Sequence, residues 1–312
     1  MIPTWATAHC PSSAPSARWM RSFPRSTRIS PKVSLAIFRT NSPWRMLSKK
    51  RTRTRKKTRI CDPSLPSSRS EGSMAVFAIG DLHLPGNSEK PMDVFGSHWE
   101  NHFETISQHW QQMIGPEDVV LIPGDISWAM QLTQIGDDLR AIEALPGQKI
   151  FLRGNHDYWW SAIGKVRALL GPGSYALQND AVKLGDEVFC GTRGWMFPTP
   201  VQPLGEQDEK VFLRECLRLR MSLDQAMKLS GGSPVTVMMH FPPLFQDGAS
   251  TAFTDILDEY PVKHVVYGHL HGHGIKVAYV GERKGAQYHL VSCDALGFCP
   301  ACIIGSEEET TI

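Results

Sequence analysis

Long hydrophobic runs are missing from this sequence. No stretch of the 312 residues approaches the ~18 consecutive apolar residues of a membrane-spanning helix. The N-terminal region also lacks the apolar centre of about 7–15 residues that marks a secretory signal. The sequence therefore gives no sign of a membrane span or of secretion. With 41% hydrophobic residues, it still has enough apolar side chains for one large domain or two small ones.

Acidic residues are nearly absent from the first 73 residues, which hold 16 Lys and Arg but only 2 Asp and Glu. This segment is rich in Ser, Pro, Thr and Arg, carries the basic run KKRTRTRKKTR at 49–59, and shows no hydrophobic periodicity. We therefore expect residues 1–73 to form a disordered basic extension. The remainder, residues 74–312, has a formal charge of −12 and is expected to form the folded domain.

Three origins would explain this extension. Met74 opens a well-formed predicted strand, so the reading we favour is that the natural protein starts there and the preceding residues are not native. An Arg- and Ser-rich, acid-poor N-terminus is also typical of an organelle transit peptide. A basic run can instead bind nucleic acid or an anionic surface.

Cysteines are few and scattered, seven in all. Because no secretory signal is present, we expect reduced thiols in a cytoplasmic protein. Cys299 and Cys302 have CxxC spacing, but the sequence holds no second CxxC, and no helix is predicted after this one. We therefore interpret the pair as a coincidence on a strand, rather than as half of a zinc site or a redox pair.

Strands and helices alternate in the first half of the folded part. Apolar runs predict strands at 75–81, 118–125 and 149–155, and helical periodicity predicts helices at 97–114, 131–147 and about 160–170. This β-α-β-α-β order is typical of parallel strands covered by helices. Beyond residue 175 the sequence predicts helices at about 205–230 and 250–258, and strands at 175–180, 181–185, 187–195, 235–240, 262–271, 275–280 and 287–293, the last two around a turn at 281–285.

Polar side chains stand where five of the predicted strands end. They are Asp81 and His83, Asp125, Asn155 and His156, His240, and His269 and His271. Ligands bind beyond the carboxyl ends of parallel strands, so we expect these side chains at one rim. Asp, His and Asn side chains together suit divalent metals such as Mn, Fe or Zn. Two ions about 3.5–4 Å apart would activate a bridging water and neutralise phosphoryl oxygens.

In chain order these residues form the pattern D-x-H, G-D, G-N-H-D, H and G-H-x-H. It appears as DLH at 81–83, GD at 124–125, GNHD at 154–157, His240, and GHLH at 268–271. The pattern resembles the calcineurin-like metallophosphoesterases, and most of all bacterial phosphohydrolases of unassigned substrate. The resemblance covers about residues 74–297. It implies an α/β fold, a four-layer α-β-β-α sandwich of two mixed sheets with the metal site at the C-terminal ends of the strands.

The resemblance also implies a role for each residue. Asp81, His83 and His271 would hold one ion, Asn155, His240 and His269 would hold the second, and Asp125 would bridge the two. His156 would contact the phosphate or protonate the leaving oxygen, and Asp157 would orient it. Mn²⁺ is the expected metal, with Fe, Zn and Mg as alternatives. The implied activity is hydrolysis of a phosphomonoester or phosphodiester in a small phosphorylated substrate, by attack of a hydroxide that bridges the metals.

Two arginines are candidates for binding the substrate phosphate. Arg193 sits between glycines in GTRGW (191–195), where backbone can approach a ligand and a guanidinium can take a phosphate bidentately. Arg153 precedes Gly154 and is the second candidate, with an ordinary charge at a strand edge as its alternative. Trp159, Trp160 and Trp195 either wall the pocket or belong to the core.

Other activities on the same fold remain open. Protein serine/threonine phosphatases carry Asp-Arg-Gly after the second Gly-Asp and Glu after Gly-Asn-His, whereas this sequence has GDISWAM (124–130) and Asp157. A nuclease or a nucleotide or lipid pyrophosphatase is an alternative, although the acidic folded part would repel a nucleic-acid backbone. A non-catalytic scaffold is less favoured because no ligand of the pattern is missing.

Overall fold

The structure is a computed structural model, and it describes residues 74–86, 92–199 and 203–305. These residues belong to one compact unit. The basic extension expected over residues 1–73 lies outside the described residues, so its predicted disorder remains a prediction. Among the described helices, none is both long enough and apolar enough to cross a membrane.

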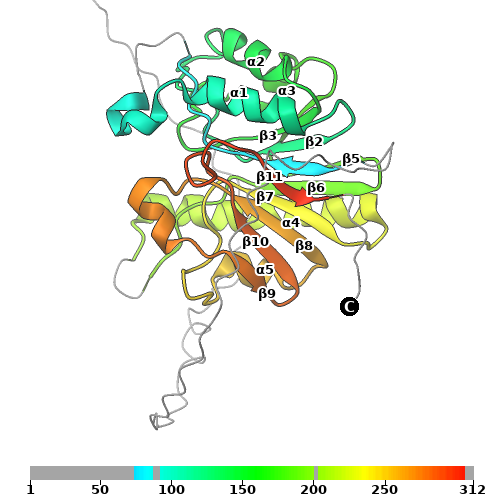
Figure 1. Cartoon of the computed structure of the whole chain (residues 1–312). Coiled ribbons are helices and arrows are strands. Elements are labelled where there is room, and N and C mark those ends of the chain that lie inside the picture. Colours follow the sequence, from blue (N-terminus) through cyan, green and yellow to red (C-terminus); the bar gives the residue numbers. More distant parts are fainter. Residues whose placement is uncertain (1–73, 87–91, 200–202, 306–312) are drawn as a thin grey trace, which may run out of the picture. The chain divides into compact units, whose positions relative to one another are not determined.

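The first sheet is built mainly from the strands that the alternating pattern predicted. Its order is β11 (Ala301–Ile304), β1 (Val76–Ala78), β2 (Val119–Ile122), β3 (Gln148–Leu152) and β4 (Ser174–Leu177). Strands β1 to β4 are parallel, and β11 joins the edge antiparallel to β1. The helices α1 (His102–Met113), α2 (Gly136–Glu143) and α3 (Ile163–Arg167) lie on one face of this sheet (Figure 1).

Helix α1 is shorter than its hydrophobic periodicity predicted. A short 3₁₀ helix, η2 (Ser97–Trp99), precedes it, and Asn101 between the two has a left-handed backbone with φ 52°. That residue interrupts the helix, so the predicted continuous helix over 97–114 was wrong at its start. The predicted face still packs inward, because Ile106 and Trp110 are buried and Trp110 donates its indole N–H to the carbonyl of Pro146.

The second sheet combines parallel central strands with antiparallel edges. Its order is β5 (Ala181–Leu184), β6 (Glu187–Thr192), β7 (Val235–Met239), β8 (Val262–Tyr267), β10 (Ala286–Leu290) and β9 (Gly281–Arg283). Strands β6, β7, β8 and β10 run parallel, and β5 and β9 are antiparallel to their neighbours. The long helix α4 (Glu206–Ser230), predicted almost to the residue, packs along β5 and β6, and α5 (Ala252–Leu257) packs on α4.

The predicted strand at 275–280 is absent from the described part of the chain. Residues Gly272–Val277 form a 3₁₀ helix, η3, and the strand pairing begins at β9, inside the predicted turn. The reversal occurs at Lys284 and Gly285, both with positive φ. The alternation of apolar residues suggested a strand, but Val277 is exposed and only the later Ala278 and Tyr279 are buried.

The two sheets pack face to face to form the core. One cluster of buried side chains joins residues of the first sheet with Phe189, Met238 and Val266 of the second. A second cluster lies between the second sheet and helices α4 and α5. Figure 1 shows the resulting order of layers, helices above, two sheets, helices below. The four-layer α-β-β-α sandwich with two mixed sheets is therefore confirmed.

Candidate metal centre

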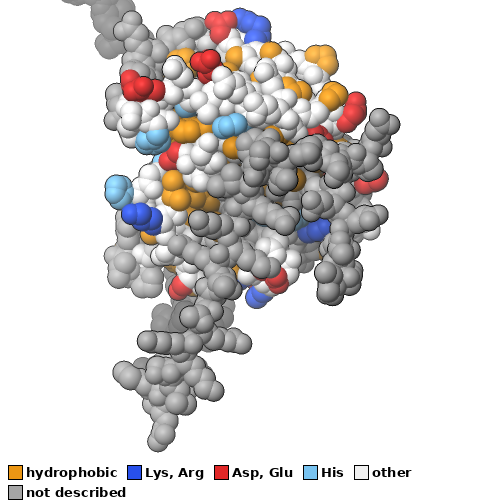
Figure 2. All heavy atoms as spheres, in the orientation of Figure 1, with side chains coloured by type: hydrophobic (Ala, Val, Ile, Leu, Met, Phe, Trp, Pro, Cys, Tyr) orange, Lys and Arg blue, Asp and Glu red, His pale blue; other side chains and the backbone are white. Residues whose placement is uncertain are grey.

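All seven predicted ligands come together where the strands of both sheets end. Asp81 and His83 follow β1, Asp125 follows β2, Asn155 follows β3, His240 follows β7, and His269 and His271 follow β8. Parallel strands direct their carboxyl ends to the same edge, and the face-to-face packing brings the two edges together. In Figure 2, the histidine side chains in view lie toward the left of the described part of the chain, with hydrophobic side chains beside them.

Two overlapping groups of side chains have the spacing of metal ligands. The ligand atoms of Asp81, His83 and His271 all lie within 4.8 Å of one another, and those of Asp81, Asp125 and His240 do so as well. The first group is the trio that the resemblance assigned to one ion. In the second group, Asp81 stands beside residues that were assigned to the other ion and to the bridge.

Asn155, His240 and His269 form the second trio, the three residues that the resemblance assigned to the second ion. The side-chain oxygen of Asn155 lies 2.7 Å from Nε2 of His240 and 2.9 Å from Nδ1 of His269. Asp125 lies between the two trios, because its Oδ2 is 3.8 Å from Nε2 of His83 and 3.5 Å from Nε2 of His240. This position fits the bridging role that the resemblance implied for Asp125.

The carboxylates of the site are buried together. Asp81, Asp125 and Asp157 are almost fully buried, and within the described residues no Lys or Arg forms an ion pair with any of them. Burial and the neighbouring Asp81 and Asp157 raise the pKa of Asp125 well above its usual range. Burial would also raise the pKa of Asp81, but the adjacent His271 lowers it. Buried carboxylates that lie this close together need bound cations to neutralise their charge.

Several imidazole nitrogens are poised to accept a cation. Nδ1 of His240 lies 3.0 Å from the carbonyl oxygen of Pro123, and the two atoms form a hydrogen bond. The carbonyl can only accept, so Nδ1 carries the proton and Nε2 keeps its lone pair. Nδ1 of His83 is also buried and has no hydrogen-bond partner among the described residues. Carboxylates, an amide oxygen and imidazole lone pairs form a donor set that fits divalent metal ions.

Asp294 is a candidate site residue that the sequence analysis missed. Its Oδ1 lies 2.9 Å from Nδ1 of His271, and its Oδ2 accepts a hydrogen bond from the Gly272 N–H. Burial lowers the pKa of His271, but Asp294 and Asp81 outweigh it and raise the pKa to about 10. Asp294 therefore turns Nε2 of His271 toward Asp81, 3.4 Å away. The available signal was the same as for the other sites, a carboxylate directly after a strand, here β10.

The backbone at the site is strained. Seven non-glycine residues among those described have positive φ, and four of them are candidate ligands: Asp81 (φ 59°), His83 (φ 46°), Asp125 (φ 51°) and His269 (φ 72°). Such conformations cost of order 1–3 kcal/mol each and concentrate at functional sites. The folded structure thus holds these side chains in positions that the isolated chain would disfavour.

Steric crowding explains why position 268, the first of the GHLH motif, is glycine. A Cβ atom at Gly268 would lie 2.4 Å from Oδ2 of Asp81. The N–H of the next residue, His269, lies 3.1 Å from both oxygens of the same carboxylate. Gly268 therefore allows the loop after β8 to pass directly over the Asp81 side chain, which brings His269 and His271 to the same site.

His156 and Asp157 occupy different environments. The His156 ring lies beside the stacked rings of His83 and Trp128, with centroids 5.8 and 4.8 Å away, and its buried Nδ1 has no hydrogen-bond partner among the described residues. Asp157 instead accepts hydrogen bonds from the N–H groups of Gly154, Ile126 and Ser127 and from the Trp159 indole. The contacts of Asp157 tie two loops together and do not include the His156 ring, so the expected orienting role finds no support in this geometry.

Both candidate arginines lack an ion pair within the described residues, although Glu215 attracts both guanidinium groups. The carbonyl of Arg193 accepts hydrogen bonds from the N–H groups of His240 and Phe241, and its guanidinium lies 4.6 Å over the Trp195 ring. Among the described residues, neither Arg193 nor Arg153 has an ion-pair partner. Burial lowers the pKa of Arg193 to about 10. Burial also lowers the pKa of Arg153, whose Nε is buried without a hydrogen bond among the described residues.

The three candidate tryptophans and the CxxC pair remain to be placed. Trp159 and Trp160 are buried in the core, whereas Trp195 lines a cavity beside the site. Cys302 lies on β11, as the interpretation of CxxC as a strand coincidence expected. In the described part of the chain, no cysteine belongs to a group with metal-ligand spacing.

Two solved structures are similar in fold. A protein of unknown function from Aquifex aeolicus, AQ665, is 14% identical with a TM-score of 0.40, and the match covers 74% of this chain and 96% of that one. The phosphopantetheinyl hydrolase PptH from Mycobacterium tuberculosis is 15% identical with a TM-score of 0.45, and the match covers 70% and 88%. None of the curated proteins matches the chain.

The chain also matches the model of a protein family. The model of the calcineurin-like phosphoesterases matches residues 74–273, more than half of the chain. The matched region contains all seven candidate ligands and His156, and ends just beyond His271. The chain therefore belongs to the calcineurin-like phosphoesterase family.

Proposed function

We propose that this protein hydrolyses a phosphomonoester or phosphodiester in a small phosphorylated substrate, with two divalent ions at the site. The observation that carries the proposal is the position of Asp125, within 3.8 Å of His83 and 3.5 Å of His240, one from each trio. Mn²⁺ is the first choice of metal because the donors mix imidazole with carboxylate and amide oxygens.

The trio of Asp81, His83 and His271 would hold one ion, and the trio of Asn155, His240 and His269 the other. Two such ions would activate a water nucleophile and neutralise the phosphoryl oxygens. Asp125 would be shared between the trios. The hydrogen bonds that His271 donates to Asp294 and that His240 donates to the Pro123 carbonyl would fix which imidazole nitrogen faces the site.

His156 is the proposed general acid. It is not part of either trio, yet its ring lies 5.8 Å from that of His83. An imidazole beside a bound phosphate can donate a proton to the leaving oxygen near neutral pH. Asp157 would contribute indirectly, because its hydrogen bonds hold the loop that carries His156. Arg193 and Arg153 are the proposed phosphate-binding residues, since each brings positive charge without an ion-pair partner in the described part of the chain.

Metal dependence is the decisive test. The full-length protein is stripped with a chelator and assayed with p-nitrophenyl phosphate and bis-p-nitrophenyl phosphate while Mn²⁺ is added back. We expect activity to return with Mn²⁺, and the ratio of the two rates to separate monoesterase from diesterase. Asp125→Asn should lower metal content and activity. Asp258→Asn, at a surface ion pair with Arg283, is the matched control. Undiminished hydrolysis by metal-free protein would refute the proposal.

The location of the protein is also part of the proposal. Cys190, Cys216 and Cys293 are free thiols, which supports the cytoplasm because its redox buffers keep thiols reduced.

A further inference from the structure

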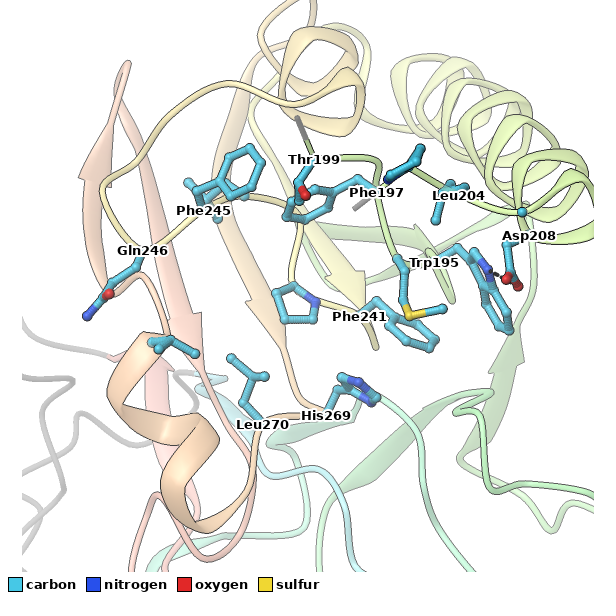
Figure 3. Close-up of a pocket in the computed structure, with 16 residues that line it drawn as sticks. Trp195, Phe197, Thr199, Leu204, Asp208, Phe241, Phe245, Gln246, His269 and Leu270 are labelled. Carbon is cyan, nitrogen blue, oxygen red and sulfur yellow. Dashed lines mark hydrogen bonds between the residues drawn. The ribbon is translucent and has the colours of Figure 1, made fainter. Parts of the chain in front are cut away.

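A largely apolar cavity opens directly beside His269. It has a volume of about 460 Å³ and lies between the loop after β6, the start of α4 and the loop after β7 (Figure 3). Figure 3 shows the side chains of Trp195, Phe197, Leu204 and Phe245 turned toward this common space. Its volume falls within the range of about 300–1,000 Å³ that is usual for small-molecule sites.

Aromatic rings connect the cavity to the candidate metal centre. The Phe241 ring lies 4.2 Å from that of His269, and the Trp195 ring lies 5.1 Å from that of Phe241. On the opposite wall Phe197 and Phe245 make an edge-to-face pair with centroids 4.6 Å apart. A molecule in the cavity would therefore touch aromatic faces continuously from the outer wall to a candidate ligand.

The charge of the lining excludes a second phosphate. No Lys or Arg is among the lining residues, and the charged side chain present is that of Asp208, whose Oδ1 accepts a hydrogen bond from the Trp195 indole. An anionic group would be repelled by Asp208 and would find no cation to pair with. The Arg193 guanidinium lies over the ring of Trp195, and Arg193 itself does not line the cavity. The lining of this cavity therefore suits a hydrocarbon group and not a phosphate.

We propose that this cavity binds the organic part of the substrate, an uncharged aromatic or aliphatic group esterified to the phosphate. The inference rests on the proposed phosphoesterase function, and it deepens that function by naming the substrate class. Hydrolysis of such an ester breaks the bond between phosphorus and the ester oxygen and adds one water, so that an alcohol and a phosphate leave. Sugar phosphates and polyphosphates lack the apolar group that this cavity fits.

Direct binding tests the inference without turnover. The full-length protein with Mn²⁺ is titrated calorimetrically with 1-naphthylphosphonate and with methylphosphonate, neither of which has an ester bond to hydrolyse. We expect the naphthyl compound to bind at least about 30-fold more tightly, because its rings leave water for an apolar space. Leu204→Trp, which fills the cavity, and Phe245→Ala, which removes a wall, should each reduce that preference about tenfold. Both should leave methylphosphonate binding unchanged.

A control variant and the results that would overturn the inference complete the test. Leu170→Ala removes a half-buried leucine that packs on the other core cluster, and it should alter neither affinity. Equal affinities for the two phosphonates, no binding of the naphthyl compound, or equal losses for both in the cavity variants would overturn the inference. If the naphthyl preference is present and sensitive to Leu204→Trp, but no phosphoester is hydrolysed, the cavity assignment stands and the proposed function fails.

Discussion

Gly154 lies so close to Asp125 that a Cβ atom on it would be 2.1 Å from Oδ1 of the carboxylate and 2.2 Å from the Asp125 nitrogen. The same Oδ1 accepts a hydrogen bond of 2.8 Å from the His156 N–H. The loop after β2 and the loop after β3 are thus in direct contact at the carboxylate that sits between both ligand trios. Glycine is required there because any larger residue would occupy the position of the Asp125 side chain.

Gly154→Ala should therefore displace Asp125 and disable the site. A shift of about 1 Å in a catalytic group can cost about 100-fold in rate, so we expect at least that loss in kcat/KM. Bound metal, measured by elemental analysis, should fall as well. Gly164→Ala is the control, because its Cβ would meet nothing within 4 Å, and alanine should stabilise helix α3 by about 0.5–1 kcal/mol. Normal metal content in Gly154→Ala would contradict this account.

Asp294→Ala tests the positioning of His271. The substitution removes the partner of Nδ1 and frees the imidazole to turn away from Asp81. Loss of such a partner typically lowers metal affinity by about 10–100-fold. We expect this loss for one of the two ions, measured by metal titration. Asp294→Asn should recover part of the affinity because its amide oxygen can still accept the hydrogen bond. Equal weakening of both ions would show that Asp294 acts on the whole fold.

His156→Ala separates chemistry from metal binding. A general acid contributes about 10²–10⁴-fold to rate, so turnover should fall on that scale while both ions remain bound. The loss should be larger for alkyl phosphates than for nitrophenyl phosphate, because nitrophenolate leaves without a proton. Asn155→Ala is the comparison: it should weaken one ion and be partly rescued by excess Mn²⁺. If His156→Ala loses metal as readily as Asn155→Ala, His156 is a ligand.

The pair of His264 and His289 should make stability depend on pH. Nδ1 of His264 lies 3.3 Å from Nε2 of His289. Burial lowers the pKa of both imidazoles to about 4, and for His264 the neighbouring His289 and Lys263 add to this effect. In the unfolded chain each ring takes up a proton near pH 6.5. The unfolded state therefore binds more protons between about pH 6.5 and 4, and stability falls as the pH decreases through that window.

His289→Gln measures this effect. Between pH 7 and 5, the free energy of unfolding in urea should fall by about 1–2 kcal/mol less in the variant than in the wild type, because one titrating ring is gone. His98→Gln removes an exposed imidazole and serves as the control. Identical pH dependence in His289→Gln and the wild type would mean that the buried pair does not titrate in this way.

Much of the site could be predicted from sequence because each part of it is local. An apolar run followed by Gly-Asp or Gly-Asn-His-Asp encodes a buried strand and the polar turn that ends it, within fewer than ten residues. Parallel pairing then brings the ends of β1, β2 and β3 to one edge without further information. The long helix α4 was predicted for a similar reason, since its hydrophobic pattern is continuous over its whole length.

The tertiary structure decided what depends on contacts between distant segments. Asp294 meets His271 only because β10 pairs beside β8, and Asp157 binds the loop after β2 only because that loop packs on Gly154. The cavity is formed by residues from the β6 loop, the start of α4, the β7 loop and the GHLH segment, and it exists only where these four segments meet. Trp195 lines this cavity while Trp159 and Trp160 enter the core, because hydrophobicity alone does not state which surface an aromatic side chain will meet.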